Sequence, residues 1–239
     1  GRVEVGMPIG FLRGPVYDGT FQSDQEAQAW MAQTNDVAYN APLVTEGDYY
    51  FKDLYGAPND DSEFYNPNPD GQVDQFDQAY LGKTTPGYYY GLNFNVAYKG
   101  LSLDMVFYGV GDIQKYNSIR QFSNPSVNGA NRSTEALNSW TPSNANTSLP
   151  RMIWGDPANN FRFSSLFIEN ADYFRLANVR VNYVFLESFY KSLGNYVSNL
   201  SIYVGSSNTF TLTNYSGLDP ESDDNPSPRM FYTGFSVNF

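Results

Sequence analysis

Five segments of the 239-residue chain alternate between apolar and polar side chains, and this pattern constrains the fold more than any other feature. Residues two apart on an extended strand point to the same face, so each segment predicts a β-strand with one apolar and one polar face. In segment 88–98 the apolar face carries Leu92, Phe94 and Val96. The other segments are 101–110, 173–185, 200–211 and 230–239. Each has about ten residues or more, which lets a tilted strand cross a bilayer.

The connections between these segments alternate in length. Lys99-Gly100 forms a tight hairpin turn, and a short polar segment around 187–196 joins the third strand to the fourth. Long stretches, 1–85, 112–170 and 212–228, precede or separate the other strands. Outer-membrane barrels have long loops outside the cell and short turns in the periplasm. The spacing therefore predicts an all-β fold: strands of an antiparallel transmembrane β-barrel, with long extracellular loops.

The two faces of the predicted strands have different expected surroundings. Polar side chains are expected to face a lumen, and they are Asn93, Asn95, Asp104, Asn178, Arg180 and Asn182. The expected membrane-facing residues are Leu92, Phe94, Val96, Leu103, Met105, Phe107, Val179, Val181 and Phe239. Aromatic residues gather at both ends of the strands, which predicts two girdles at the bilayer interfaces. The final Phe239 resembles the C-terminal signal recognised by the barrel-assembly machinery.

Composition excludes several classes of function. The chain has no Cys and no His, which removes disulfides, thiolate metal sites and the commonest general base. A net charge of −11 argues against nucleic acid. No apolar run is long enough for a transmembrane helix. Carboxylate pairs at Asp60-Asp61 and Asp223-Asp224 are interpreted as solvated loop tips, and no catalytic motif is present, so an enzyme is not expected.

One stretch has the spacing of an EF-hand-like calcium loop. Calcium prefers oxygen ligands at positions one, three, five, seven, nine and twelve, with glycine at position six. Gly71 occupies position six, although Asn replaces Asp at position one and Asp replaces Glu at position twelve. The candidate ligands are Asn66, Asn68, Asp70, Gln72, Asp74 and Asp77. The alternative is a polar loop without metal.

The long loops also contain local signals for helices and for recognition. Ser23 and Glu26 form a capping box that predicts a helix over 24–33, and 131–140 has the pattern of a second short helix. Trp30, Trp140 and Trp154 lie in the predicted loops. Aromatic faces beside polar side chains suit sugars or peptides, so these are candidate ligand or partner contacts. The alternative is packing within the loops.

An ordered set of motifs resembles the SusC/RagA family of TonB-dependent outer-membrane transporters. The N-terminal part contains Gly6-Met-Pro-Ile-Gly10, Tyr17-Asp-Gly-Thr-Phe-Gln22 and Gly47-Asp-Tyr-Tyr-Phe-Lys-Asp53. Asp70-Gly-Gln-Val-Asp-Gln-Phe-Asp77 and Tyr80-Leu-Gly82 follow. The later motifs are Trp140-Thr-Pro142, Pro150-Arg151, Phe174-Arg-Leu-Ala-Asn-Val179, Asn208-Thr-Phe-Thr-Leu-Thr213 and Tyr215-Ser-Gly-Leu-Asp-Pro-Glu221. The set covers essentially the whole chain.

The resemblance implies a function beyond what the strands indicate. It implies the C-terminal part of a plugged barrel of about 22 strands that imports nutrients such as oligosaccharides or peptides across the bacterial outer membrane. It further implies a SusD-like surface lipoprotein as partner, and TonB acting on an N-terminal plug upstream of this chain. The alternative is a soluble extracellular β-sandwich that binds carbohydrate. The two differ in whether the apolar stripes face lipid or a second sheet.

Overall fold

The chain folds into two compact units, each built from segments far apart in the sequence. The computed structural model describes residues 6–34, 44–59, 65–123, 131–193, 196–222 and 225–239. The loop unit comprises Gly1–Thr85 and Gln114–Glu169, and the sheet unit comprises Pro86–Ile113 and Asn170–Phe239. Two stretches expected as separate loops therefore pack together in one unit.

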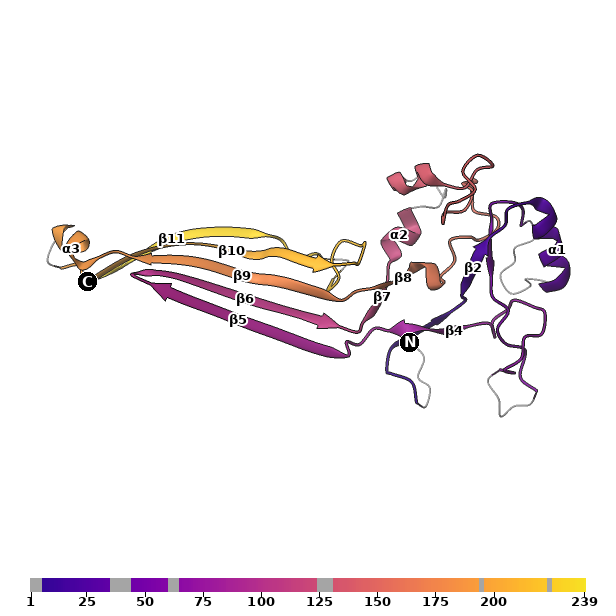
Figure 1. Ribbon diagram of the computed structural model, residues 1–239, viewed down its shortest axis with the longest axis horizontal. Helices are drawn as coiled ribbons and strands as arrows, with labels where there is room; N and C mark the ends of the chain where they lie inside the picture. Colours follow the sequence, from indigo (N-terminus) through magenta and orange to yellow (C-terminus); the bar gives the residue numbers. More distant parts are fainter. Residues whose placement is uncertain (1–5, 35–43, 60–64, 124–130, 194–195, 223–224) are drawn as a thin grey trace. The chain divides into compact units, whose positions relative to one another are not determined.

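The sheet unit is one antiparallel sheet of long strands (Figure 1). The spatial order of its five strands is β11-β10-β9-β6-β5. The strands are β5 (Tyr88–Tyr98), β6 (Leu101–Gly111), β9 (Tyr173–Val184), β10 (Asn199–Thr213) and β11 (Met230–Asn238). These bounds agree within two residues with the segments predicted from alternation. Alternation with period 2 is a property of neighbouring residues, so it predicts a strand without knowledge of the rest of the fold.

Backbone geometry fixes the register of the sheet at two places. Lys99 and Gly100 have φ values of 46° and 86°, as a two-residue type I′ hairpin requires, and they join β5 to β6 without a register shift. Beyond Asn178 the register shifts, so that Leu176 lies opposite Phe107 on β6 and opposite Phe210 on β10. This β-bulge in β9 reverses which residues of its first part share a face.

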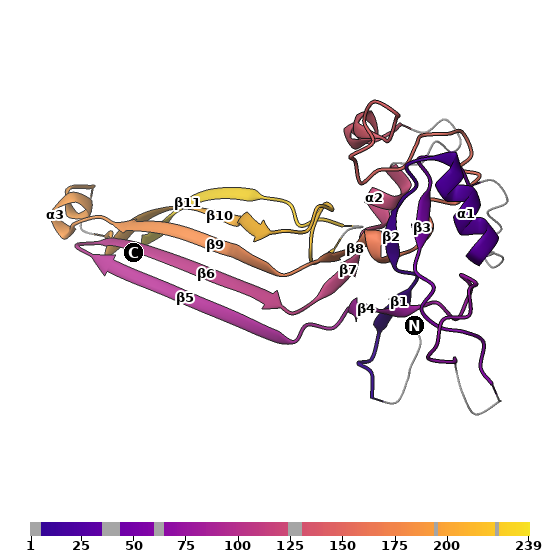
Figure 2. The same cartoon turned by 45° about the vertical axis from the view of Figure 1, so that its right-hand side comes forward.

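The loop unit contains three small two-stranded antiparallel sheets that sequence analysis did not predict (Figure 2). β1 (Phe11–Gly14) pairs with β4 (Ala79–Lys83), and β2 (Tyr17–Thr20) pairs with β3 (Tyr49–Phe51). The third pair is β7 (Gln114–Tyr116) with β8 (Ile168–Asn170). These strands have three to five residues each, too short for a clear alternation.

The helices are short, and one of the two predicted helices is confirmed. α1 (Asp24–Thr34) begins after Ser23, whose Oγ accepts the Glu26 N–H at 3.2 Å, as the capping box predicts. Residues 131–140 hold only a 3-10 turn, η1 (Thr134–Asn138). The remaining helical segments are α2 (Ser118–Ser123), η2 (Ser165–Phe167), α3 (Glu187–Tyr190) and η3 (Lys191–Leu193). None of the helices in the described part of the chain is long and apolar enough to cross a membrane.

Aromatic side chains form the core of the loop unit. Phe21 packs edge-on against Trp30 of α1, with ring centroids 5.6 Å apart, in a cluster that includes the fully buried Ala27. Phe51 and the fully buried Val73 belong to a neighbouring cluster. Burial of one such large side chain contributes about 1.5–3 kcal/mol, so these clusters are sufficient to hold the short strands together.

Candidate functional site

The sheet unit presents one continuous apolar face. Directly opposed residues in antiparallel strands share a face, and Phe94 opposes Met105, which in turn opposes Val179. The same register aligns Val96, Leu103 and Val181. All the strand residues predicted to face the membrane lie on this face: Leu92, Phe94, Val96, Leu103, Met105, Phe107, Val179 and Val181. Phe239 lies just beyond β11 and is exposed.

The opposite face is polar, as predicted. Asp104 opposes both Asn95 and Arg180, and Asn95 donates a hydrogen bond to the Asp104 carboxylate. The Arg180 guanidinium lies over the Tyr203 ring, 4.1 Å from its centroid. The remaining predicted lumen residues, Asn93, Asn178 and Asn182, lie on this same face. Such a surface hydrogen-bonds water or polar solutes but gives no favourable contact to hydrocarbon.

Arg175 is the most buried charged side chain on the polar face, with 2% of its side chain exposed. Its Nη2 donates to Asp219 at 2.7 Å, and its Nη1 donates to Glu221 at 2.9 Å. Its Nε donates to the Thr211 hydroxyl at 2.9 Å. The Tyr108 hydroxyl donates to the same Glu221 oxygen at 2.9 Å. We call this cluster the Arg175 latch, because it fastens the β10–β11 connection to the polar face.

The latch joins two motifs that sequence analysis could only place in order. Arg175 belongs to the 174–179 motif on β9, and Asp219 and Glu221 belong to the 215–221 motif after β10. Burial acts to raise the pKa of Asp219, but the N–H groups of Glu221 and Ser227 together with Arg175 outweigh it, and the pKa is lowered. Asp219 is therefore a carboxylate at neutral pH, and it compensates the buried guanidinium.

Sequence analysis missed Arg175 because strict alternation places it on the apolar face. Counting in twos from Val179 gives Ala177 and Arg175 on one side, whereas Asn178 and Arg180 lie on the other. The bulge leaves Ala177 without an opposed residue, so Arg175 joins Asn178 and Arg180 on the polar face. The sequence did contain a signal of the bulge, because Arg175 falls in a stripe that is otherwise apolar. An unpaired charge that faces lipid is strongly unfavourable, so the stripe could not continue unchanged through Arg175.

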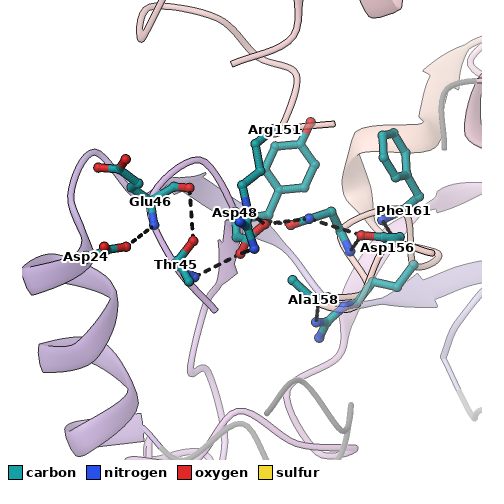
Figure 3. A network of polar contacts seen from close by, with 11 residues as sticks. Asp24, Thr45, Glu46, Asp48, Arg151, Asp156, Ala158 and Phe161 are labelled. Carbon is teal, nitrogen blue, oxygen red and sulfur yellow. Dashed lines mark hydrogen bonds and ion pairs between the residues drawn. The ribbon is translucent and has the colours of Figure 1, made fainter. Parts of the chain in front are cut away.

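A second buried charge cluster holds the loop unit together (Figure 3). Asp48 is completely buried and accepts two hydrogen bonds from Arg151, Nε at 2.8 Å and Nη2 at 2.9 Å. Asn160 donates to Asp48 at 2.9 Å, and its own carbonyl oxygen accepts the Tyr49 N–H at 2.7 Å. Asp156 accepts the N–H groups of Asn160 and Phe161. The cluster thus ties the 47–53 motif to residues about 100 positions later, in the second segment of this unit.

The predicted calcium loop is occupied by internal hydrogen bonds. Asp77 is fully buried, and its two carboxylate oxygens accept the N–H groups of Leu54, Tyr55 and Asp74 at 2.5, 2.9 and 2.7 Å. Asp70 and Asp74 each accept the N–H two residues later. Within the described residues no three acidic side chains gather in an arrangement that could hold a metal ion.

Calcium binding at Asn66, Asn68, Asp70, Gln72, Asp74 and Asp77 stays a prediction, and it requires several of these hydrogen bonds to be replaced. Asp70, Asp74 and Asp77 do not form a three-carboxylate group in the described chain, so no functional step is derived from calcium. Calorimetric titration of Ca²⁺ into the protein and into an Asp70→Ala variant tests the prediction. The acidic pairs at 60–61 and 223–224 lie outside the described residues.

The three tryptophans have different environments. Trp140 is buried, and its ring fills the space beside Gly47, where an added Cβ would lie 2.4 Å from it. Trp30 packs on Phe21 in the core. Trp154 is 67% exposed and follows the half-exposed Ile153. Of the predicted contact residues, only Trp154 presents most of its ring to solvent, so ligand or partner contact stays a prediction for it above all.

The chain is similar to two curated TonB-dependent receptors. The chain is 28% identical to the TonB-dependent receptor P3 of Formosa agariphila, over 98% of this chain and 22% of that protein. It is 29% identical to the TonB-dependent receptor SusC of Bacteroides thetaiotaomicron, over 86% of this chain and 20% of that protein. No family model matches the sequence.

Solved structures show the same fold. A structure of the RagAB peptide importer in its open-open state superposes with a TM-score of 0.70 at 22% identity, over 99% of this chain and 23% of that one. A second RagAB peptide transporter structure also gives a TM-score of 0.70, at 21% identity, and covers 96% of this chain. The chain thus spans about a fifth of the length of the proteins it matches.

Proposed function

We propose that the chain is a SusC/RagA-type segment of a TonB-dependent transporter and that it forms a wall of a plugged outer-membrane barrel that imports nutrients. The observation that carries the proposal is the two-faced sheet. Leu92, Val204 and Phe235 are 57%, 55% and 77% exposed on the apolar face. Exposure of a contiguous apolar surface that extends over five strands is favourable in hydrocarbon and unfavourable in water.

The rival interpretation, a soluble β-sandwich, requires the same apolar face to pack against a second sheet. In the described chain these apolar residues are exposed, and the sheet unit contains a single sheet. The buried charge on the polar face also favours a barrel wall, because Arg175 and its carboxylates lie where a lumen would be. In a plugged transporter barrel of about 22 strands, five strands make up about 23% of the wall.

The proposed orientation places the loop unit outside the cell and the Arg175 latch at the extracellular end of the lumen-facing side of the sheet. The short connections, Lys99-Gly100 and the α3 segment, then face the periplasm, as in other outer-membrane barrels. In this arrangement the loop unit is the surface that a SusD-like lipoprotein would contact, with exposed Trp154 as a candidate contact. The Asp48 cluster supports such a role, because it makes a long loop region rigid before a partner binds.

The proposed cargo is an oligosaccharide or a peptide, and TonB is proposed to drive its release by acting on the plug. One structural neighbour is named as a peptide importer. The net charge of −11 favours neutral or cationic substrates over acidic ones. Phe239 is proposed to engage the barrel-assembly machinery.

Cell fractionation combined with uptake tests the proposal. The full-length protein is expected in the outer-membrane fraction, released only by detergent. Cells are then supplied with fluorescent oligopeptides and oligosaccharides of graded size. Uptake of one class is expected to disappear both on deletion of this gene and on deletion of TonB. Recovery of the protein as a freely soluble species, or uptake that persists without it, would refute the proposal.

A further inference from the structure

The connection between β9 and β10 was expected to be a polar turn, but it carries exposed apolar side chains. α3 and η3 occupy half of it, at the end of the sheet unit where the C-terminus also lies (Figure 1). Leu186 is 66% exposed, Phe189 is 49% exposed and Tyr196 is 87% exposed. A turn that only reverses the chain between two strands has no need for these side chains, and their exposure in water is unfavourable.

Phe189 continues the apolar face of the sheet through a row of aromatic contacts. Tyr183 lies on that face opposite Leu101 and Ile202. Phe185 packs edge-on against Tyr183, with centroids 5.1 Å apart, and Phe189 stacks on Phe185 at 4.9 Å. The aromatic row therefore runs from the sheet onto α3 without a break.

The opposite side of α3 is charged. Glu187 and Lys191, four residues apart, form an ion pair there, and both are exposed. Residues at i and i+4 share one side of a helical turn, and Phe189, midway between them, points the other way. The segment thus has one apolar and one charged side, as interfacial helices do.

No strand outside this chain can pair directly with the two strands that the turn joins. β9 and β10 both lie inside the sheet, flanked by β6 and β11, and any further strand of a barrel would attach at the outer edges, β5 and β11. The neighbouring turn is that of the β5–β6 hairpin, whose Gly100 carbonyl accepts the Val184 N–H at 2.8 Å. There Lys99 lies 5.1 Å from the centroid of the Tyr98 ring, a cationic and aromatic pair suited to a headgroup layer.

We propose that the α3 turn is a membrane-interface anchor, in which Leu186 and Phe189 insert into the phospholipid headgroup and upper acyl region at the short-turn end of the sheet. The inference rests on the proposed barrel, because it needs the apolar face to contact lipid. It adds a contact that the strands alone do not supply: a short helix lying in the interface, which fixes how deeply this end of the wall sits in the bilayer.

Site-directed spin labelling of the full-length transporter in phospholipid nanodiscs tests the anchor. The 239-residue chain contains no Cys, so single cysteines can be introduced in it at Phe189, Leu186, Lys191 and Val181, after replacement of any cysteine elsewhere in the full-length protein. Each nitroxide is compared for collision with oxygen, which partitions into lipid, and with a water-soluble nickel chelate. Labels at Phe189 and Leu186 are expected to favour oxygen several-fold over the label at Lys191, which lies on the charged side of the turn.

The Val181 label separates failure of the anchor from failure of the barrel. If Val181 favours oxygen while Phe189 and Leu186 report water, the anchor is wrong and the barrel wall stands. If Val181 itself reports water, the proposed function fails with it. Labelling at Phe189 removes the ring stacked on Phe185 and can therefore alter the local structure. The label at Leu186 leaves that ring pair in place, so it checks the result independently. Protection of both labels from oxygen and nickel alike would indicate burial against protein, which also overturns the anchor.

Discussion

Replacing Arg175 with Met removes the guanidinium of the latch while nearly preserving its aliphatic volume. The side chain donates to two carboxylates and to Thr211, and both Arg175 and Asp219 are almost fully buried. Removal of one member of a buried ion pair costs about 3–5 kcal/mol, because the other charge is left uncompensated. Asp219 keeps its backbone donors and Glu221 is 46% exposed, so we expect the low end, about 3 kcal/mol.

Hydrogen exchange in the β10–β11 connection measures this cost directly. A loss of about 3 kcal/mol in local opening free energy corresponds to roughly 150-fold faster amide exchange around 215–222, with the centre of β9 unchanged. Arg175→Lys keeps the charge but loses the forked geometry, so it should be intermediate. The double variant with Asp219→Asn should exchange more slowly than the two single effects predict together. If Arg175→Met leaves exchange in the connection unchanged, the latch does not hold it.

Three further predictions concern other parts of the chain. Asp48→Asn removes a fully buried charge and should speed exchange over 45–51 by about 100-fold or more, whereas Asp18→Asn, in a half-exposed ion pair, should change it by less than about fivefold. Since the pKa of Asp219 is lowered by folding, its stabilising contribution is complete above about pH 5, and it decreases as the pH falls through the ordinary value and then the lowered value. Exchange measured at pH 7 and pH 5 should therefore show equal latch stability after correction for intrinsic rates. Gly109→Ala would place a Cβ 2.1 Å from a backbone oxygen of β9 and should lower barrel stability by about 1–3 kcal/mol, read as an earlier loss of heat-modifiable migration on gels. Gly91→Ala, whose Cβ would have no described atom closer than 3.6 Å, should lower it by less.

Features encoded within a few neighbouring residues were predictable from the sequence. The long strands follow from side-chain alternation. The hairpin follows from the two-residue connection Lys99-Gly100 between two alternating segments, and the positive φ values of both residues confirm it. The capping box at Ser23 and Glu26 correctly placed the start of α1. The short strands of the loop unit were missed because three to five residues carry too little pattern.

Tertiary structure decided where the charged groups went. Asp48 and Arg151 are 103 residues apart, and nothing local identifies them as partners. Asp77 has the spacing of a metal ligand, yet three backbone N–H groups saturate its oxygens. Each partner is chosen by which donors the folded backbone brings to a site without water, because an unpaired charge there is prohibitively unfavourable.

The position of Arg175 depends both on a pattern that is visible in the sequence and on a feature that only the tertiary structure shows. The sequence by itself determined that β9 has an apolar and a polar face, since alternation is a property of every extended chain. It did not determine on which face Arg175 lies, because one bulged residue at Ala177 inverts the parity of everything before it. The folded sheet determines the face on which Arg175 lies, because Asp219 and Glu221 accept its hydrogen bonds on the polar face, whereas the side chains of the apolar face offer it no carboxylate.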